Sequence, residues 1–194
     1  MISSQWEALN GKFSIPSGPI RLIDYGCGQG LAGLMLYRRF GQAFSSCWST
    51  VVLIEPSAVA LIRAEAVYRA IAPQADIVCF RKRFDDIGPT DLEDGSGHTT
   101  LHLFSNVLDV AGFDHVQLFG KALVVGKHTI LAVSPDRDFD GGTSRLRDLE
   151  SVIENPEYAG CFVGVVSELT TFKCGDREQY PVVSWLAKFE VVDG

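Results

Sequence analysis

The chain has 194 residues, of which 46% are hydrophobic and 21% are charged, and its formal net charge is −7. This length is enough for one domain with a hydrophobic core, and this composition excludes an intrinsically disordered chain. The negative charge makes a nucleic-acid partner unlikely, because a phosphate backbone would be repelled at long range.

The cysteines and the start of the chain indicate the compartment. The five cysteines are odd in number and form no Cys-x-x-Cys pair, which is typical of free thiols in a reducing compartment. The first residues lack a basic segment followed by an apolar one, and no apolar run reaches membrane-spanning length. We therefore expect a cytoplasmic protein with no membrane partner, and we predict no metal site.

The first half of the chain alternates between apolar strands and helices. A strand at 20–25 breaks into glycines, and a helix from 31 to 40 stops at Gly41. A β-branched strand at 50–54 precedes a helix at 58–66, which Ser57 caps and Pro73 ends. A third strand at 76–80 leads into a polar loop in which we expect no strong helix.

The second half of the chain continues to alternate between strands and helices and then ends in two consecutive strands. It predicts a strand at 100–104, a short helix from about 113 to 123, a strand at 129–133 and a helix from about 143 to 153. Two longer strands follow, one starting at 161–166 and the other at 182–191 after Pro181. The alternation of residue types along these last two strands suits an antiparallel hairpin. The continuous apolar runs of the earlier strands instead indicate a sheet covered on both faces.

These elements predict an α/β fold with a Rossmann-like, mostly parallel seven-stranded sheet, helices on both faces and a C-terminal antiparallel hairpin. We expect a single domain over 1–194, with a lead-in at 1–19 and the core at 20–192. Ligands of such sheets bind beyond the carboxyl ends of the strands.

Three alternate glycines follow the first strand, in the sequence DYGCGQG at 24–30. Because they lack Cβ atoms, a ligand can approach the backbone closely, and we expect a nucleotide-like ligand. Gly28, Gly30 and Gly33 also spell GxGxxG, the dinucleotide fingerprint. Asp24 favours a cationic ligand over a pyrophosphate, which this carboxylate would repel.

This turn resembles the first motif of the class I S-adenosylmethionine-dependent methyltransferase family. The sequence IEPS at 54–57 is similar to the second motif of that family, which implies that Glu55 holds both ribose hydroxyls. A carboxylate at a strand end can accept two hydrogen bonds from a vicinal diol. The alternative for Glu55 is a solvated charge at the start of the next helix.

Two further segments match the family less closely. In RFDD at 83–86, Arg83 occupies the place of the usual acid, and the resemblance implies that Phe84 lies against adenine and Asp85 binds its amine. The segment 103–110 is similar to the one that faces the methyl group, which implies that Ser105 and Asn106 lie beside the donor. The implied cofactor-binding residues are Asp24, Tyr25, Gly26, Cys27, Gly28, Gly30, Glu55, Pro56, Phe84, Asp85, Ser105 and Asn106.

The resemblance implies methyl transfer from S-adenosylmethionine to a small molecule or a protein. Candidates for the proton acceptor are Asp109, Asp114 and His115, whose alternative roles are helix starts for the two carboxylates and a surface position for the imidazole. A non-catalytic scaffold or regulatory domain of the same fold, and an NAD-dependent oxidoreductase, are the other functions left open. A second copy of the chain or a partner subunit could complete the acceptor pocket.

Overall fold

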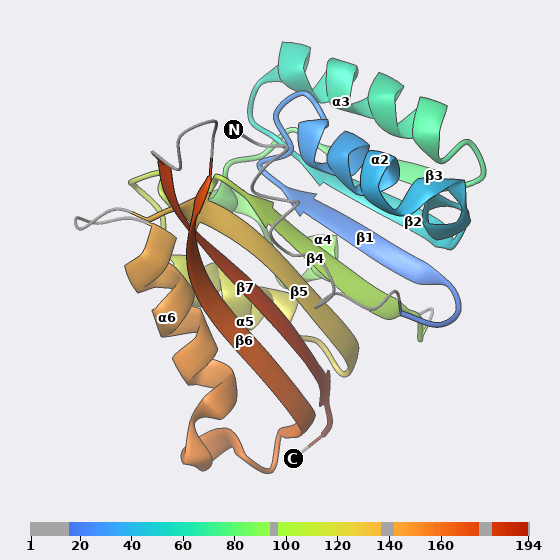
Figure 1. Cartoon of the computed structure of the whole chain (residues 1–194). Coiled ribbons are helices and arrows are strands. Elements are labelled where there is room, and N and C mark those ends of the chain that lie inside the picture. Colours follow the sequence, from blue (N-terminus) through green and yellow to red (C-terminus); the bar gives the residue numbers. More distant parts are fainter. Residues whose placement is uncertain (1–15, 94–96, 137–141, 175–179, 194) are drawn as a thin grey trace.

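One seven-stranded sheet forms the centre of the protein in the computed structural model, which describes residues 16–93, 97–136, 142–174 and 180–193 (Figure 1). Most of the predicted lead-in, residues 1–15, lies outside this part of the chain. The strands are β1 (Ile20–Tyr25), β2 (Trp48–Ile54), β3 (Asp76–Phe80), β4 (Thr99–Ser105), β5 (Gly126–Pro135), β6 (Phe162–Cys174) and β7 (Tyr180–Val191). The helices are α2 (Leu31–Ser45), α3 (Ala58–Ile71), α4 (Pro89–Leu92), α5 (His115–Ala122) and α6 (Gly142–Glu154), with short 3-10 turns at Phe84–Asp86 and Pro156–Tyr158.

The strand order is β3-β2-β1-β4-β5-β7-β6. The first five strands of this order run parallel, and β7 lies antiparallel to both β5 and β6. The predicted fold class, including the C-terminal antiparallel hairpin, is confirmed. From β1 the chain proceeds outward through β2 to β3 and then returns to the other side of β1 with β4. The point between β1 and β4 where the order reverses is where open α/β sheets bind their ligands.

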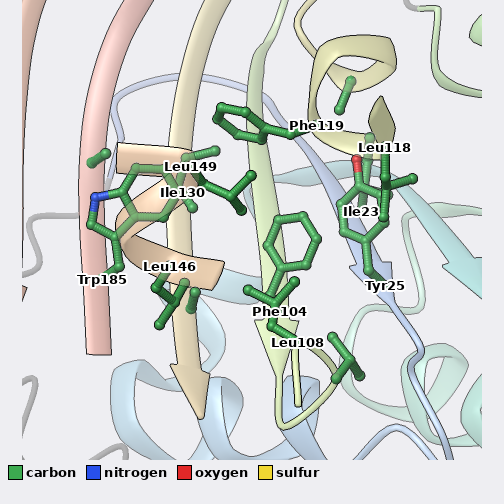
Figure 2. Close-up of a cluster of buried hydrophobic side chains, with 14 of the residues drawn as sticks. Ile23, Tyr25, Phe104, Leu108, Leu118, Phe119, Ile130, Leu146, Leu149 and Trp185 are labelled. Atoms are coloured by element: carbon green, nitrogen blue, oxygen red, sulfur yellow. The ribbon is translucent and has the colours of Figure 1, made fainter. Parts of the chain in front are cut away.

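Two apolar clusters, one on each face, hold the helices against the sheet. Because side chains alternate along a strand, Leu22 and Ile23 of β1 point to opposite faces. Leu22 packs with Leu36 of α2 and Leu61 of α3. Ile23 belongs to the cluster under α5 and α6, in which Trp185 is fully buried (Figure 2). The opposite face of the sheet therefore remains for α2 and α3, as Figure 1 shows.

The observed elements differ from the predicted ones mainly at their ends. At Gly41 the backbone leaves the helical region, with φ 73° and ψ −175°, but a short helical piece continues to Ser45. The strand β5 is longer at both ends than predicted, because it pairs with β7 from Gly126 to Pro135. The polar loop contains the four-residue helix α4, which begins at Pro89 and whose Asp91 accepts a hydrogen bond from the Gly88 amide at 2.8 Å. Four residues are too few for a helical period to be visible in the sequence.

In the described ranges no helix is both long enough and apolar enough to cross a membrane.

Candidate functional site

The turn between β1 and α2 contains three glycines with left-handed backbone angles. Gly26, Gly28 and Gly30 have φ values of 60°, 53° and 79°, which residues with a Cβ rarely adopt. A Cβ on Gly26 would lie 2.6 Å from Val107 Cγ1, and one on Gly30 would lie 3.1 Å from the Cα of Ala64. A Cβ on Gly28 would meet nothing within 4 Å. Gly28 is thus the glycine of the turn that faces open space, where a ligand could reach the backbone.

Asp24 places a carboxyl group below this turn. Its side chain is almost fully buried, and Oδ2 accepts a hydrogen bond from the Tyr68 hydroxyl at 2.8 Å. Oδ1 is buried and has no hydrogen-bond partner among the described residues. Burial raises the pKa of Asp24 to about 7, the Tyr68 hydrogen bond lowers it, and the Glu55 carboxylate raises it. A buried carboxylate oxygen without a donor is costly, so this position favours a ligand that brings positive charge.

Glu55 follows β2 and joins the glycine turn to the start of α3. Its Oε2 accepts a hydrogen bond from the Gly28 amide at 3.1 Å, and its Oε1 accepts one from the Ser57 amide at 2.9 Å. The helix-start role considered for Glu55 is therefore present in the structure. Each carboxylate oxygen has a second lone pair, so the same side chain can also accept hydrogen bonds from a vicinal diol.

A pocket of about 280 Å³ opens beside this turn. The ends of β2 and β3 form one wall, and the connection from β4 to α5 forms the other. The rings of Phe84 and Phe113 both line it and contact each other, with centroids 4.6 Å apart. Ligand pockets for drug-sized molecules span roughly 300–1,000 Å³, so this one suits a single flat ring system better than a dinucleotide. Its lining residues are Pro56, Arg83, Phe84, Asp85, Val110, Ala111, Gly112 and Phe113.

The structure thus brings three predicted cofactor residues, Pro56, Phe84 and Asp85, to one pocket. Arg83, at the place of the usual acid, lines it as well. The opposite wall, Val110–Phe113, contains none of the predicted cofactor-binding residues, although Val110 ends the segment 103–110 that resembles the family. The sequence predicts that a helix starts at about Phe113, whereas α5 begins at His115, so Phe113 belongs to the connection that lines the pocket.

The side chains of Tyr25 and Cys27 point into the protein. Tyr25 is fully buried, stacks on Phe104 with ring centroids 4.3 Å apart, and its hydroxyl lies 3.0 Å from His102 Nδ1. Cys27 is only 6% exposed. Both residues therefore shape the turn through their backbone, and the Cys27 amide donates a hydrogen bond to the Ile54 carbonyl.

Ser105 and Asn106 lie where β4 ends, next to the glycine turn. The pairing of Tyr25 with Phe104 places the end of β4 beside the end of β1. Asn106 has a φ of 55°, and its amide donates a hydrogen bond to the Val133 carbonyl at 2.8 Å. A left-handed residue other than glycine is uncommon, and such backbone strain clusters at functional sites. Both side chains are partly exposed, so they can contact a bound molecule.

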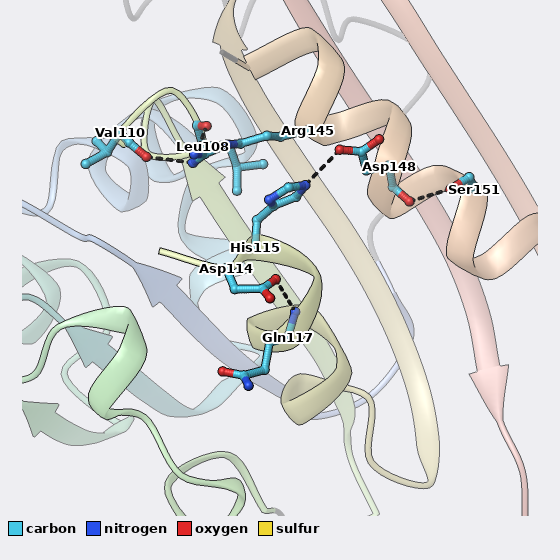
Figure 3. Close-up of polar contacts among 8 residues, drawn as sticks. All are labelled: Leu108, Val110, Asp114, His115, Gln117, Arg145, Asp148 and Ser151. Atoms are coloured by element: carbon cyan, nitrogen blue, oxygen red, sulfur yellow. Dashed lines mark hydrogen bonds and ion pairs between the residues drawn. The ribbon is translucent and has the colours of Figure 1, made fainter. Parts of the chain in front are cut away.

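Two of the three candidate proton acceptors are engaged elsewhere (Figure 3). Asp114 caps α5, where its side chain accepts a hydrogen bond from the Gln117 amide at 2.9 Å. Nε2 of His115 lies 3.0 Å from an Asp148 carboxylate oxygen, so the imidazole points toward α6. Asp109 lies in the turn after β4 and is partly buried.

The sequence matches no known protein family and no curated protein. Among solved structures, the chain is similar to TYW2 of M. jannaschii in complex with AdoMet, with a TM-score of 0.57 and 14% identity over 99% of this chain and 78% of that one. It is also similar to a candidate rRNA methylase from Clostridium thermocellum, with a TM-score of 0.56 and 13% identity over 90% and 88% of the two chains.

A third similar structure is a candidate sarcosine dimethylglycine methyltransferase from Galdieria sulphuraria, with a TM-score of 0.52 and 16% identity over 90% of this chain and 79% of that one. These likenesses show that the chain has the fold of the class I S-adenosylmethionine-dependent methyltransferases.

Proposed function

We propose that this protein binds S-adenosylmethionine and transfers its methyl group to a small molecule or a protein. The observation that carries the proposal is Asp24, a buried carboxyl group with an unpartnered oxygen below a turn whose Gly28 faces open space. S-Adenosylmethionine carries an ammonium and a sulfonium and no phosphate, so it supplies the positive charge that this site lacks.

The remaining residues fit the other parts of such a ligand. Glu55 is at the edge of the turn and can accept hydrogen bonds from both ribose hydroxyls. The pocket that Phe84 and Phe113 line offers an aromatic surface to the adenine ring, and Asp85 in its wall can accept a hydrogen bond from the adenine amine. Ser105 and Asn106 lie at the end of β4, on the side where we place the acceptor.

An NAD-dependent oxidoreductase fits less well. A pyrophosphate on the glycine turn would lie close to the carboxylates of Asp24 and Glu55, which would repel it. The classic dinucleotide sheet has six strands in the order 3-2-1-4-5-6, whereas this sheet has an antiparallel strand between β5 and β6.

The chemistry requires few catalytic side chains. The bound donor supplies an electrophilic methyl group, and the protein aligns the acceptor and removes its proton. The pocket and Glu55 would fix the nucleoside, while the end of β4 would orient the acceptor. Asp114 and His115 are not assigned as the base, because one caps α5 and the other pairs with Asp148.

Isothermal titration calorimetry with S-adenosylhomocysteine, S-adenosylmethionine and NAD tests the binding. At about pH 8, where Asp24 is ionised, we expect both S-adenosyl ligands to bind and NAD not to bind. Asp24→Asn should weaken S-adenosylhomocysteine at least tenfold, or about 1.4 kcal/mol, because a charge-assisted contact is lost. Asp76→Asn, an exposed position at the start of β3, is the matched control. An absence of binding at millimolar ligand, or an affinity that Asp24→Asn leaves unchanged, would contradict the proposal.

A donor-binding scaffold without activity is the second candidate. It is favoured by Arg83 at the place of the usual acid and by the engagement of Asp114 and His115 in helix contacts. A cell lysate incubated with the protein and a donor labelled in its methyl group separates the two functions. Transfer of label to any lysate component supports the enzyme, and bound donor without transfer supports the scaffold.

A further inference from the structure

Tyr68 of α3 is held in one orientation between the two helices on its face of the sheet. Its side chain is fully buried, and its ring occupies the space that a side chain on Gly33 of α2 would need, with Cζ 2.2 Å from the position of a Cβ there. The ring also lies against Trp48, with centroids 5.9 Å apart. A tyrosine packed this tightly has little freedom to turn its hydroxyl elsewhere.

The Tyr68 hydroxyl points at the carboxyl group below the glycine turn. It donates a hydrogen bond to Asp24 Oδ2 at 2.8 Å, and Oδ1 is left without a partner among the described residues. The bond joins residues 44 positions apart, from α3 to β1. Tyr68 therefore fixes the direction of the carboxylate and satisfies only one of its two oxygens.

The groups that act on Asp24 come from three elements. Tyr68 faces it from α3 and lowers its pKa through the hydrogen bond, and Glu55 faces it from the end of β2 and raises its pKa. Burial raises the pKa of the Cys27 thiol in the turn, and the nearby Asp24 charge raises it further. No ion pair to Asp24 is present among the described side chains. Burial raises the pKa of Asp24 to about 7, and the Tyr68 hydroxyl is the protein group that offsets part of this rise.

We infer that Tyr68 is a positioning residue for the cationic end of the donor, because its hydroxyl fixes the direction of the Asp24 carboxyl group through Oδ2 and leaves Oδ1 for the ligand ammonium. This inference rests on the proposed function and adds a residue that no motif of the sequence indicates. It also makes ligand binding depend on the protonation of one buried carboxyl group.

The sign of this dependence follows from linkage. The ammonium interacts favourably with the ionised carboxylate, and burial raises the pKa of Asp24 to about 7. Affinity should therefore rise with pH up to about 7 and level off above it, with a slope of about tenfold per pH unit on the acid side. Removing the hydroxyl removes the interaction that lowers this pKa, so the rise should move to higher pH.

Calorimetry of the wild type and of Tyr68→Phe between about pH 5.5 and 8.5 measures this shift. We expect the S-adenosylhomocysteine curve of Tyr68→Phe to lie about one pH unit higher, with about fivefold weaker binding at pH 7 and similar binding at the alkaline end. The control ligand is 5′-methylthioadenosine, which has no ammonium, and its affinity should be the same in both proteins. Tyr37→Phe, on the neighbouring helix α2, is the matched control variant.

Two results would overturn the inference. One is an S-adenosylhomocysteine curve that Tyr68→Phe leaves at the same pH. The other is an equal loss of affinity for both ligands, which would mean that Tyr68 only supports the fold. If the wild type binds neither nucleoside, the proposed function fails. Carbon-13 NMR of the Asp24 carboxyl in the free protein, assigned with Asp24→Asn, then shows independently whether Tyr68→Phe moves its titration.

Discussion

Gly26, Gly28 and Gly30 share a left-handed backbone but differ in what surrounds them. Gly26 is enclosed by Val107 and the edge of the Phe84 ring, so it joins the turn to the wall of the pocket. Gly28 has open space where its side chain would be, and its amide holds Glu55. One glycine is therefore required by packing and the other by access to the backbone.

Alanine at these two positions should separate stability from binding. Gly28→Ala should destabilise the fold by about 1 kcal/mol, the cost of a left-handed backbone for a residue with a Cβ. Gly26→Ala should cost about 2–4 kcal/mol, because the 2.6 Å approach to Val107 adds overpacking. We expect Gly28→Ala to weaken S-adenosylhomocysteine more strongly relative to its loss of stability. Urea unfolding measures the loss of stability in each variant, and calorimetry measures the loss of affinity. Equal losses of stability in the two variants would contradict the difference in packing.

At the scale of elements, α6 holds one wall of the pocket in place. The Arg145 guanidinium donates hydrogen bonds to the carbonyls of Leu108 and Val110, at 3.1 Å and 2.6 Å (Figure 3). It also lies 5.0 Å from the centroid of the Phe113 ring. A planar donor with several N–H groups suits two carbonyls and a ring, which lysine cannot match. The connection from β4 to α5 therefore depends on a helix that follows the next strand.

Replacing Arg145 should loosen the pocket without unfolding the protein. We expect Arg145→Ala to speed amide hydrogen exchange in 107–113 and to weaken S-adenosylhomocysteine about tenfold, because the wall must then be ordered on binding. Arg145→Lys should restore only part of this loss. The control is Arg147→Ala, whose side chain is exposed on the same helix. Unchanged exchange in 107–113 would mean that other contacts hold the wall.

The sequence predicts those elements and site residues whose signal is local. The glycine turn, the Ser57 cap and the breaks at Gly41 and Pro73 are each carried by neighbouring residues, so the elements around them were predicted closely. The length of β5 could not be predicted, because it is set by pairing with β7, which follows only after α6 and β6. Tyr68 looks like any apolar position of a helix. Its hydroxyl gains a role only when folding brings α3 over the end of β1.

At the scale of the whole molecule, a chain of buried polar groups crosses three strands beneath α5. The Val124 carbonyl accepts from His128 Nε2 at 2.7 Å, His128 Nδ1 lies 2.9 Å from His102 Nε2, and His102 Nδ1 lies 3.0 Å from the Tyr25 hydroxyl. One tautomer of each neutral imidazole satisfies every contact. Burial lowers the pKa of both histidines, and the charges of His128 and Arg21 lower the pKa of His102 further. For His128 the hydrogen bond to Val124 opposes the effect of burial, and the Arg21 charge adds to it.

Acid should therefore destabilise the protein, with Asp24 opposing the effect. Histidines that stay neutral when folded, but take up protons near 6.5 when unfolded, lower the stability as pH falls below about 6.5, by about 1.4 kcal/mol per pH unit each. Asp24 has a raised pKa and acts in the opposite direction between about 7 and 3.8. The net loss should be about 1.4 kcal/mol per unit, since two groups act against one.

The variant Asp24→Asn tests this account, because it removes the opposing group. Its stability should fall about twice as steeply as that of the wild type between about pH 6 and 5, in urea unfolding followed at each pH. Asp76→Asn should follow the wild type. Parallel curves for Asp24→Asn and wild type would mean that Asp24 is charged in the folded protein throughout this range.

The place of β7 between β5 and β6 also constrains how the protein is made. As β6 leaves the ribosome, the strand to which it must pair has not yet been synthesised, and the edge of β5 is equally uncovered. The sheet can close only after β7 emerges, so a nascent chain carries two open strand edges, which promote association with other chains. A premature stop codon before Tyr180 would leave both edges exposed permanently and should direct the product to chaperones and proteases.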